Sequence, residues 1–199
     1  MTIPALPAAS VLVVDDRPDL HVVIGRRRPG SAFVGGLIVF PGGGVDPEDV
    51  STDARRLVPA ASVPELAPEE GASFLHAAIR ETEEEVGLDI AGPGPVEADR
   101  FPHVGRWITP EGAPRRYDTH FFLARYRGGA VVADQIELTD AWWERPADAL
   151  QRIDEGHLEA IRPTIEFLRS LSGYRNVADA FAGTGCGQRR GATNGWTSF

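Results

Sequence analysis

Cysteine, basic charge and long apolar runs are all scarce in this sequence. Cys186 is the single cysteine among 199 residues, so no intrachain disulfide can form, and a reducing cytoplasm is the compartment we expect. The amino-terminal stretch has no basic segment and its apolar run ends at Asp15, which predicts neither a signal peptide nor a membrane span. We therefore expect a soluble protein without a membrane partner.

Basic side chains are outnumbered by acidic ones. Lysine and arginine together number 20 against 29 aspartates and glutamates, which gives a formal net charge of −9. Affinity for nucleic acid comes mainly from clustered basic side chains, so this balance argues against a nucleic-acid partner. An anionic substrate would need a local cation, supplied by arginine or by a metal ion.

The composition is that of a globular protein, with 42% apolar and 25% charged residues. We place a single domain at residues 1–182 and a flexible tail, rich in glycine and small polar residues, at 183–199. Residues 50–67 are proline-rich and lack a period, which predicts a loop-like insert that is mobile or weakly packed, with at most a short helical turn. The sequence is compatible with a homodimer and does not determine the oligomeric state.

Apolar patterning predicts alternating strands and helices. The β-branched runs at 10–16 and 21–27 predict a hairpin, and a third apolar run ends in the glycines 42–44, where the backbone can approach a ligand closely. Further strands are expected near 103–112, 117–127 and 137–146, and helices near 146–157 and 158–171. The strongest helix signal starts at Pro68 and ends at Gly87, with apolar residues recurring at helical spacing between them.

The stretch "IRETEEEVGL", residues 79–88, concentrates acidic side chains near the end of that helix. At 100° per residue, Glu81, Glu84 and Glu85 fall at roughly 0°, 300° and 40°, so they share one face. Such a run usually faces water, but like charges at this spacing, close to a helix C-terminus, destabilise the helix. A hard cation such as Mg²⁺ prefers carboxylate oxygens and would remove the repulsion. The face is therefore a candidate metal site.

The segments "FPGGGVDPED", residues 40–49, and "RETEEEVGL", residues 80–88, together resemble the Nudix box. The first supplies a glycine, five further residues and an acidic residue, and the second supplies R-E-x-x-E-E-x-G followed by an apolar residue. Asp49 stands where the motif normally has glutamate, Thr82 stands at a usually apolar position, and 30 residues separate Asp49 from Arg80, more than the motif usually has. Together with the segments flanking it, this long spacer resembles the branch of Nudix hydrolases that includes peroxisomal coenzyme A diphosphatases, over about residues 10–170.

The resemblance implies an α/β fold, the Nudix fold, in which a mixed β-sheet is sandwiched between α-helices. It also implies hydrolysis of a pyrophosphate bond in a nucleoside diphosphate linked to another moiety, with Mg²⁺ or Mn²⁺ as cofactor. Coenzyme A or an acyl-CoA is the leading substrate candidate within that class. The alternative is a non-catalytic Nudix-like domain that binds a nucleotide as a sensor, against which the intact glutamates favour an enzyme.

The resemblance also suggests residue roles. Glu84 and Glu85 are expected to be the principal metal ligands, with Glu81 as a further ligand or helper and the carbonyl of Gly43 as a main-chain ligand. Arg80 is expected to hold the loop and helix together or to contact phosphate. Glu137 lies at a predicted strand edge and is a candidate general base, the alternative being an exposed strand-end carboxylate. Arginine suits phosphate contacts, so the candidates for substrate binding, weighed against ordinary solvation, are Arg26, Arg28, Arg115 and Arg116.

Overall fold

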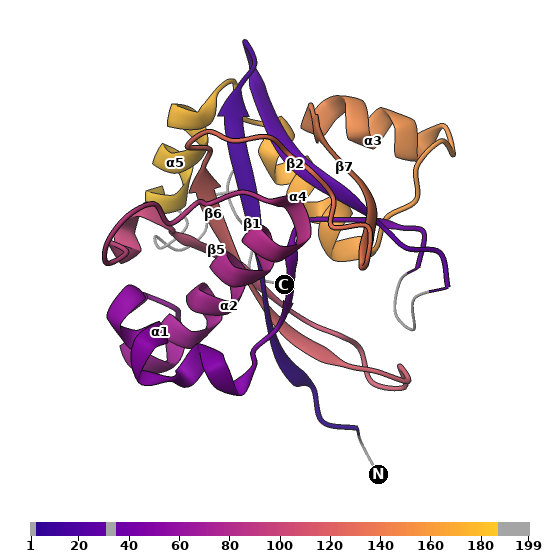
Figure 1. Ribbon diagram of the computed structural model, residues 1–199. Helices are drawn as coiled ribbons and strands as arrows, with labels where there is room; N and C mark the ends of the chain where they lie inside the picture. The colour runs from indigo at the N-terminus through magenta and orange to yellow at the C-terminus, as the bar shows by residue number, and fades with distance from the viewer. Residues whose placement is uncertain (1–2, 31–34, 187–199) are drawn as a thin grey trace.

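A mixed β-sheet forms the centre of the molecule (Figure 1). The computed structural model describes residues 3–30 and 35–186. Within them the sheet has seven strands in the order β3-β2-β1-β6-β5, with β4 paired to β1 and β7 paired to β2. Strands β1 and β6 run parallel, and the other pairs are antiparallel. The strands are β1 Leu6–Asp16, β2 Leu20–Arg27, β3 Ile38–Val39, β4 Gly42–Gly44, β5 His103–Ile108, β6 Tyr117–Arg125 and β7 Leu138–Glu144.

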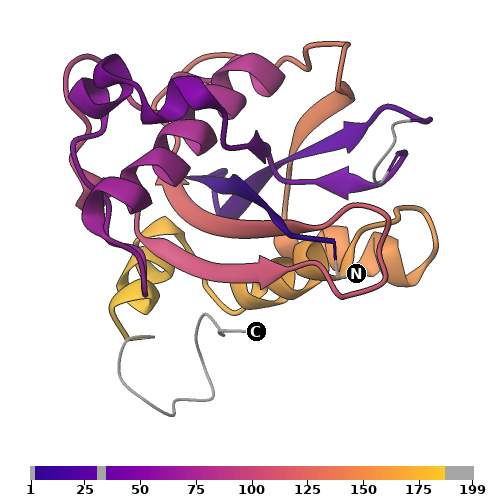
Figure 2. The same ribbon diagram turned by 90° about the horizontal axis from the view of Figure 1, so that it is seen from below.

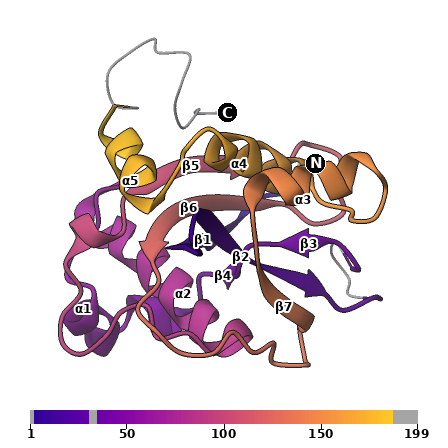
Figure 3. The ribbon, with the colours of Figure 1, turned by 90° about the horizontal axis from the view of Figure 1, so that it is seen from above.

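Helices cover both faces of the sheet, as Figures 2 and 3 show in end views. One face carries α1 (Thr52–Leu57) and α2 (Pro68–Val86), and the other carries α3 (Pro146–Asp154), α4 (Arg162–Ser172) and α5 (Val177–Cys186). Two short 3-10 turns, Pro47–Val50 and Ala98–Arg100, connect these elements. The expected sandwich of a mixed sheet between helices is confirmed. No helix in the described ranges is both long and apolar enough to cross a membrane.

The middle of β1 is buried on both faces. Val11 and Val13 pack toward α2, while Leu12 and Val14 pack toward α4, and all four are at most 1% exposed. This explains why the segment reads as a continuous apolar run, because an alternating pattern appears only where one face of a sheet meets water. The central strand therefore fixes two separate cores, one on each side.

The predicted insert at 50–67 proves to be packed, so the prediction of a mobile or weakly packed excursion is wrong. Val58, Ala61 and Val63 are 1%, 3% and 5% exposed and join the core of the α2 face. Gly71 on α2 permits the close approach, because a Cβ there would lie 2.6 Å from the carbonyl oxygen of Ala61. These small and β-branched residues have no regular spacing. They are buried by a tertiary contact with α2, and local sequence pattern does not reveal such a contact.

The predicted start of the flexible tail, at residue 183, is also too early in the sequence. Helix α5 continues to Cys186, so the first residues of the segment 183–199 are helical. Its glycines and small residues concealed this helix from pattern analysis, since glycine disfavours helices in the absence of tertiary contacts. Residues 187–199 lie outside the described part of the chain.

Candidate active site

Helix α2 presents the acidic cluster to the sheet. It begins with Pro68 at its first position and ends at Gly87, which adopts a left-handed conformation with φ of 70° and donates its N–H to the carbonyl of Glu83. Thr82 is fully buried at the position where an apolar residue was expected. Its hydroxyl donates to the carbonyl of Ala78 at 2.6 Å, which satisfies the polar group inside the core.

Glu85 is the most deeply buried of these glutamates, at 2% exposed. Its Oε2 accepts a hydrogen bond from the N–H of Gly42 at 2.9 Å, whereas its Oε1 has no hydrogen-bond partner among the described residues. Burial raises the pKa of Glu85 to about 8, and the nearby charges of Glu81 and Glu137 act in the same direction. A buried carboxylate with a free oxygen is unusual, because leaving such a group unpaired costs stability.

Glu81 lies one helical turn before Glu85 and faces the glycine strand β4. It is 9% exposed, and a Cβ on Gly43 would collide with its carboxylate. A side chain at Gly43 would therefore force the Glu81 carboxylate to move from this position. Burial raises the pKa of Glu81, and the neighbouring Arg80 opposes that rise.

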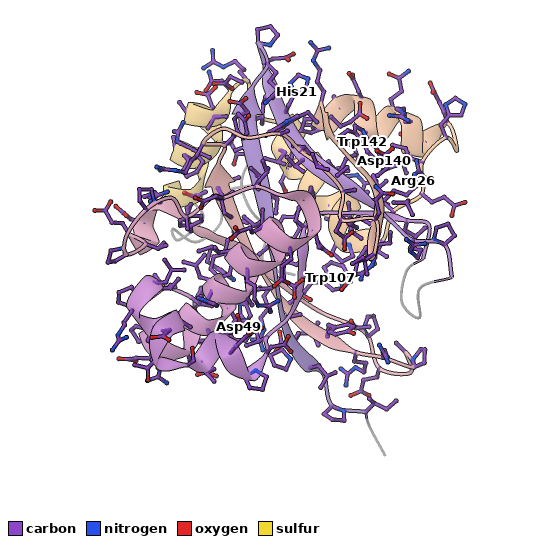
Figure 4. The ribbon with its side chains drawn as sticks, viewed as in Figure 1. His21, Arg26, Asp49, Trp107, Asp140 and Trp142 are labelled. Carbon is purple, nitrogen blue, oxygen red and sulfur yellow. The ribbon has the colours of Figure 1, made fainter. Side chains whose placement is uncertain are left out.

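Arg80 locks the loop before the insert onto α2. Its Nε and a terminal nitrogen donate to Asp49 at 3.1 and 3.0 Å, and it also donates to the carbonyl of Gly44 at 3.1 Å. The same guanidinium reaches Glu81 at 2.9 Å and Glu84 at 3.0 Å. Arg80 thus holds the geometry of loop and helix. Asp49, labelled in Figure 4, is 2% exposed.

A cavity of about 870 Å³ opens beside this cluster. Strand β1 runs between its two sides, since Ala8 pairs with Gly44 of β4 on one edge and with Thr119 of β6 on the other. The β4 side carries the acidic cluster, and the β5–β6 side is lined by aromatic and apolar residues together with the first turn of α4. The lining residues used below are Arg27, Gly42, Gly43, Glu81, Trp107, Arg115, Ile136 and Glu137.

The structure brings some predicted site residues to the cavity and not others. Glu81, Gly43, Glu137 and Arg115 line it, and buried Glu85 is coupled electrostatically to both Glu81 and Glu137. Glu84 does not line it: its side chain is 57% exposed and pairs with Arg80.

Three of the predicted substrate-binding arginines also lie outside the lining. Arg26 points toward Trp142, 5.8 Å from the ring centre, on the side of the sheet that Figure 4 shows near α3. Arg28 donates to the carbonyls of Gln135 and Ile136. Arg116 donates to the carbonyls of Ile3 and Thr109, at 2.7 and 2.9 Å.

Arg27, the middle residue of the same arginine run, is the one that lines the cavity. A bulge shifts the β2–β7 register between Arg26 and Arg27, and bulges re-aim the side chains that follow them. Arg27 pairs with Glu137 at 2.5 Å, while its Nε is buried without a partner among the described residues. Strand alternation does predict that neighbouring arginines point to opposite faces, but nothing local shows which one faces the site.

Comparison with known proteins identifies the scaffold. The family model for the NUDIX domain matches residues 4–163. The chain belongs to the Nudix family. It is 29% identical to a NUDIX hydrolase from Alicyclobacillus acidocaldarius, with a TM-score of 0.78 over 90% of this chain and 96% of that one. Among curated proteins none matches.

Two more distant structures share the fold alone. A MutT NUDIX hydrolase from Burkholderia pseudomallei is 18% identical, with a TM-score of 0.55 over 84% of this chain and 98% of that one. The NUDIX domain of Shewanella oneidensis NrtR, solved in complex with ADP ribose, is 13% identical, with a TM-score of 0.55 over 84% and 86% of the two chains.

This Nudix protein is a pyrophosphohydrolase, and enzymes of the family hydrolyse pyrophosphate bonds in nucleoside diphosphate derivatives and generally need divalent metal ions. Within residues 3–30 and 35–186, no group of three or more acidic, histidine or cysteine side chains is placed so that it could hold a metal ion by itself. Mg²⁺ does not need one, because it binds through one or two carboxylates and fills its remaining positions with water and substrate phosphate. The free Oε1 of Glu85 and the nearby carboxylate of Glu81 fit that donor set.

Proposed function

We propose that this Nudix hydrolase cleaves its substrate with Mg²⁺ or Mn²⁺ held by Glu81 and Glu85, with the Gly43 carbonyl as a main-chain ligand and Glu84 as a further ligand at the rim. The observation that carries this proposal is the unpartnered Oε1 of Glu85, in a carboxylate that is 2% exposed. A divalent cation would supply the missing partner, and it would offset the repulsion that Glu81, Glu85 and Glu137 exert on one another.

The chain's own groups supply position and proton transfer. A bound metal ion stabilises negative charge on the phosphate oxygens and acidifies water. Glu137 projects from the cavity lining and serves as the acceptor of the proton from the attacking water. Arg27 and Arg115 also line the cavity and contact the phosphates, roles that we prefer for them over Arg26 and Arg116 because of where the side chains lie.

For the substrate we favour coenzyme A or an acyl-CoA, with another adenine nucleotide derivative as the alternative. Coenzyme A carries a ribose phosphate in addition to its pyrophosphate, together with a long pantetheine arm. Arg115 supports this choice, because it lines the cavity and makes no ion pair or hydrogen bond among the described residues. The apolar lining around Trp107 and Ile136 suits the arm. The segment 31–34, part of the arginine-led "PGSAFVGG" stretch, lies outside the described residues.

Metal dependence is tested by thermal unfolding with and without Mg²⁺ or Mn²⁺. A ligand that binds only the folded state stabilises it by about 2.7 kcal/mol at one hundred times its dissociation constant. We expect a rise in melting temperature for the wild type and a much smaller rise for Glu85→Gln. Equal shifts in the two proteins would contradict metal binding at Glu85.

Substrate choice is tested by chromatographic analysis of the products formed from coenzyme A, dephospho-CoA, nucleotide sugars, dinucleotides and nucleoside triphosphates. If coenzyme A is the substrate, the products are 3′,5′-ADP and 4′-phosphopantetheine, and dephospho-CoA is cleaved less efficiently because it lacks the charge-assisted contact. Equal kcat/KM for the two would remove the argument from the 3′-phosphate. Rapid turnover of another class without coenzyme A cleavage would reject the coenzyme A proposal alone.

A further inference from the structure

A tight turn presents Glu137 to the cavity, and Asp134 organises it. The Asp134 carboxylate accepts hydrogen bonds from three successive backbone N–H groups, those of Ile136 at 3.1 Å, Glu137 at 3.0 Å and Leu138 at 2.9 Å. Gln135 lies inside the turn with a left-handed φ of 61°, which a residue other than glycine adopts only when its surroundings favour it. The carboxylate of Asp134 is therefore the centre around which the chain folds here.

Arg28 holds the outer side of the same turn. Its Nε donates to the carbonyl of Ile136 at 2.9 Å, another guanidinium nitrogen donates to the carbonyl of Gln135, and its backbone N–H donates to the carbonyl of Glu137 at 2.9 Å. Burial alone would raise the pKa of Asp134, but the three backbone hydrogen bonds and the charge of Arg28 outweigh it and lower that pKa. Asp134 thus binds the N–H groups of residues 136–138, and Arg28 binds the carbonyls of residues 135–137.

The turn is also fastened directly to the acidic helix. The backbone N–H of Asp134 donates to the carbonyl of Glu85 at 3.0 Å, and that of Val132 donates to the carbonyl of Val86 at 3.0 Å. The last carbonyls of a helix lack partners within the helix, so these bonds also complete the end of α2. Asp134 consequently links the main chain of Glu85 to the main chain of Glu137.

Glu137 needs such restraint because its neighbours repel it. Its side chain is 52% exposed, and its charge disfavours the charged forms of both Glu81 and Glu85. An unrestrained carboxylate would move into solvent, away from the other two. Arg27 attracts Glu137 from within the cavity lining, but a salt bridge to one flexible side chain does not fix the backbone that carries it.

We infer that Asp134 and Arg28 are positioning residues that hold Glu137 at the reacting water, rather than residues that bind substrate. The inference rests on the proposed role of Glu137 as proton acceptor. Because both residues act through Glu137, their loss lowers kcat and leaves KM and metal binding nearly unchanged. A small displacement of a catalytic group is enough to cost up to about 100-fold in rate.

A double-mutant cycle on the full-length protein tests this, with kcat and KM measured on the best substrate of the panel. We expect Glu137→Gln to lower kcat by about 100-fold and Asp134→Ala to lower it by about 10-fold or more. In the Glu137→Gln background, Asp134→Ala should change kcat by about twofold or less, because the group it positions is already gone. Asp134→Asn keeps one oxygen acceptor and should recover part of the loss.

Two controls separate positioning from damage to the fold. Asp140→Ala removes an exposed aspartate from neighbouring β7 that makes no ion pair or side-chain hydrogen bond within the described residues, and it should leave kcat within about twofold. The Mg²⁺-induced rise in melting temperature should be as large in Asp134→Ala as in the wild type. If Asp134→Ala does not fold, Asp134→Asn enters the cycle in its place.

Equal losses from Asp134→Ala in the two backgrounds would overturn the inference, as would folded Asp134 variants with normal kcat. An unchanged kcat in Glu137→Gln would also overturn it, because no catalytic carboxylate would then remain to be positioned. A wild-type protein that is inactive on every substrate would overturn the proposed function and the inference together. Active wild-type enzyme with additive losses would overturn the inference alone.

Discussion

Two carboxylates in this protein are equally buried and have opposite electrostatic environments. Asp49 and Glu85 are each 2% exposed. Asp49 receives hydrogen bonds from Arg80, from His76 at 2.7 Å and from the backbone of Asp46 at 2.7 Å. Glu85 receives one, from Gly42, and its second oxygen has no partner in the described part of the chain.

The pKa values of the two groups follow from these contacts. Burial raises the pKa of each carboxyl, but at Asp49 the hydrogen bonds from Arg80 and His76 outweigh burial and lower it. At Glu85 nothing comparable opposes burial, and the pKa rises to about 8. A satisfied buried carboxylate stabilises the fold, whereas an unsatisfied one is held in place by the rest of the fold and is available to a ligand.

The largest effect should come from Glu85→Gln. We expect kcat with Mg²⁺ to fall by about 10³-fold, equivalent to about 4 kcal/mol, because the metal loses a charged ligand. The metal-free variant should melt at the same or a higher temperature than the wild type, since the amide carries no buried charge and its oxygen can still accept from Gly42. Turnover within threefold of the wild type would show that Glu85 is not a catalytic ligand.

Asp49→Ala should lower the stability of the fold rather than act on catalysis. It removes the partner that Arg80 and His76 share, while Arg80 keeps Glu81, Glu84 and the carbonyl of Gly44, so we expect the free energy of unfolding to fall by about 1–3 kcal/mol. Urea unfolding should show this loss. Glu48→Ala in the same turn removes only a 3.7 Å ion pair between Arg80 and a side chain that is 66% exposed, and it should change the free energy of unfolding by no more than about 0.5 kcal/mol. An equally small change for Asp49→Ala would contradict a stabilising role for Asp49.

A buried pair of histidines extends the comparison to neutral groups. Nε2 of His103 lies 3.0 Å from Nδ1 of His120, and burial lowers the pKa of each to about 4. Between about pH 6.5 and pH 4 the unfolded chain binds protons that the folded pair does not, so the pair makes the free energy of unfolding fall as pH falls. Glu85 acts in the opposite direction over the same range, because its folded pKa of about 8 keeps a proton that the unfolded carboxyl releases. Each histidine contributes a slope of up to about 1.4 kcal/mol per pH unit.

The measurement is urea unfolding at several pH values in that window. His103→Gln keeps a polar group beside His120 and removes one titrating site, so the slope should be shallower than in the wild type. Exposed His157→Gln is the matched control and should leave the slope unchanged. Equal slopes in His103→Gln and the wild type would contradict neutral burial of the pair.

Local pattern predicted the features that depend on local spacing. The first hairpin and the bounds of α2 follow from periodicity and from helix signals at Pro68 and Gly87. The helical spacing also placed Glu81 and Glu85 on the buried side, whereas Glu84, predicted on the same face, is exposed and does not line the cavity. The assignment of roles to individual arginines did not follow, because a bulge in β2 decides which side chain faces the cavity.

The sequence also did not predict the roles of residues that bind main-chain groups far away in the chain. Asp134 gave no signal, since its importance comes from a turn closed by its own carboxylate and from a hydrogen bond to the carbonyl of Glu85. Arg28 was predicted to bind phosphate because an arginine run suggests anion binding. In the structure its guanidinium instead donates to carbonyls more than 100 residues away in sequence. Such contacts depend on tertiary structure, which a one-dimensional pattern does not contain.

The smallest effect separates a packed insert from a mobile one. Val58 follows α1 and is 1% exposed within the same core cluster as Leu75 of α2. Val58→Ala removes two methyl groups from that core and should lower the free energy of unfolding by about 2 kcal/mol, with kcat/KM within about twofold because the side chain does not line the cavity. Val50→Ala, at a 49% exposed position just before the insert helix, should change stability by no more than about 0.5 kcal/mol.

If both variants are equally stable, the insert contributes little to the core and acts as a surface loop. A changed substrate preference in Val58→Ala would instead mean that the insert supports the cavity through α2, because α2 is the element that joins Val58 to the acidic face.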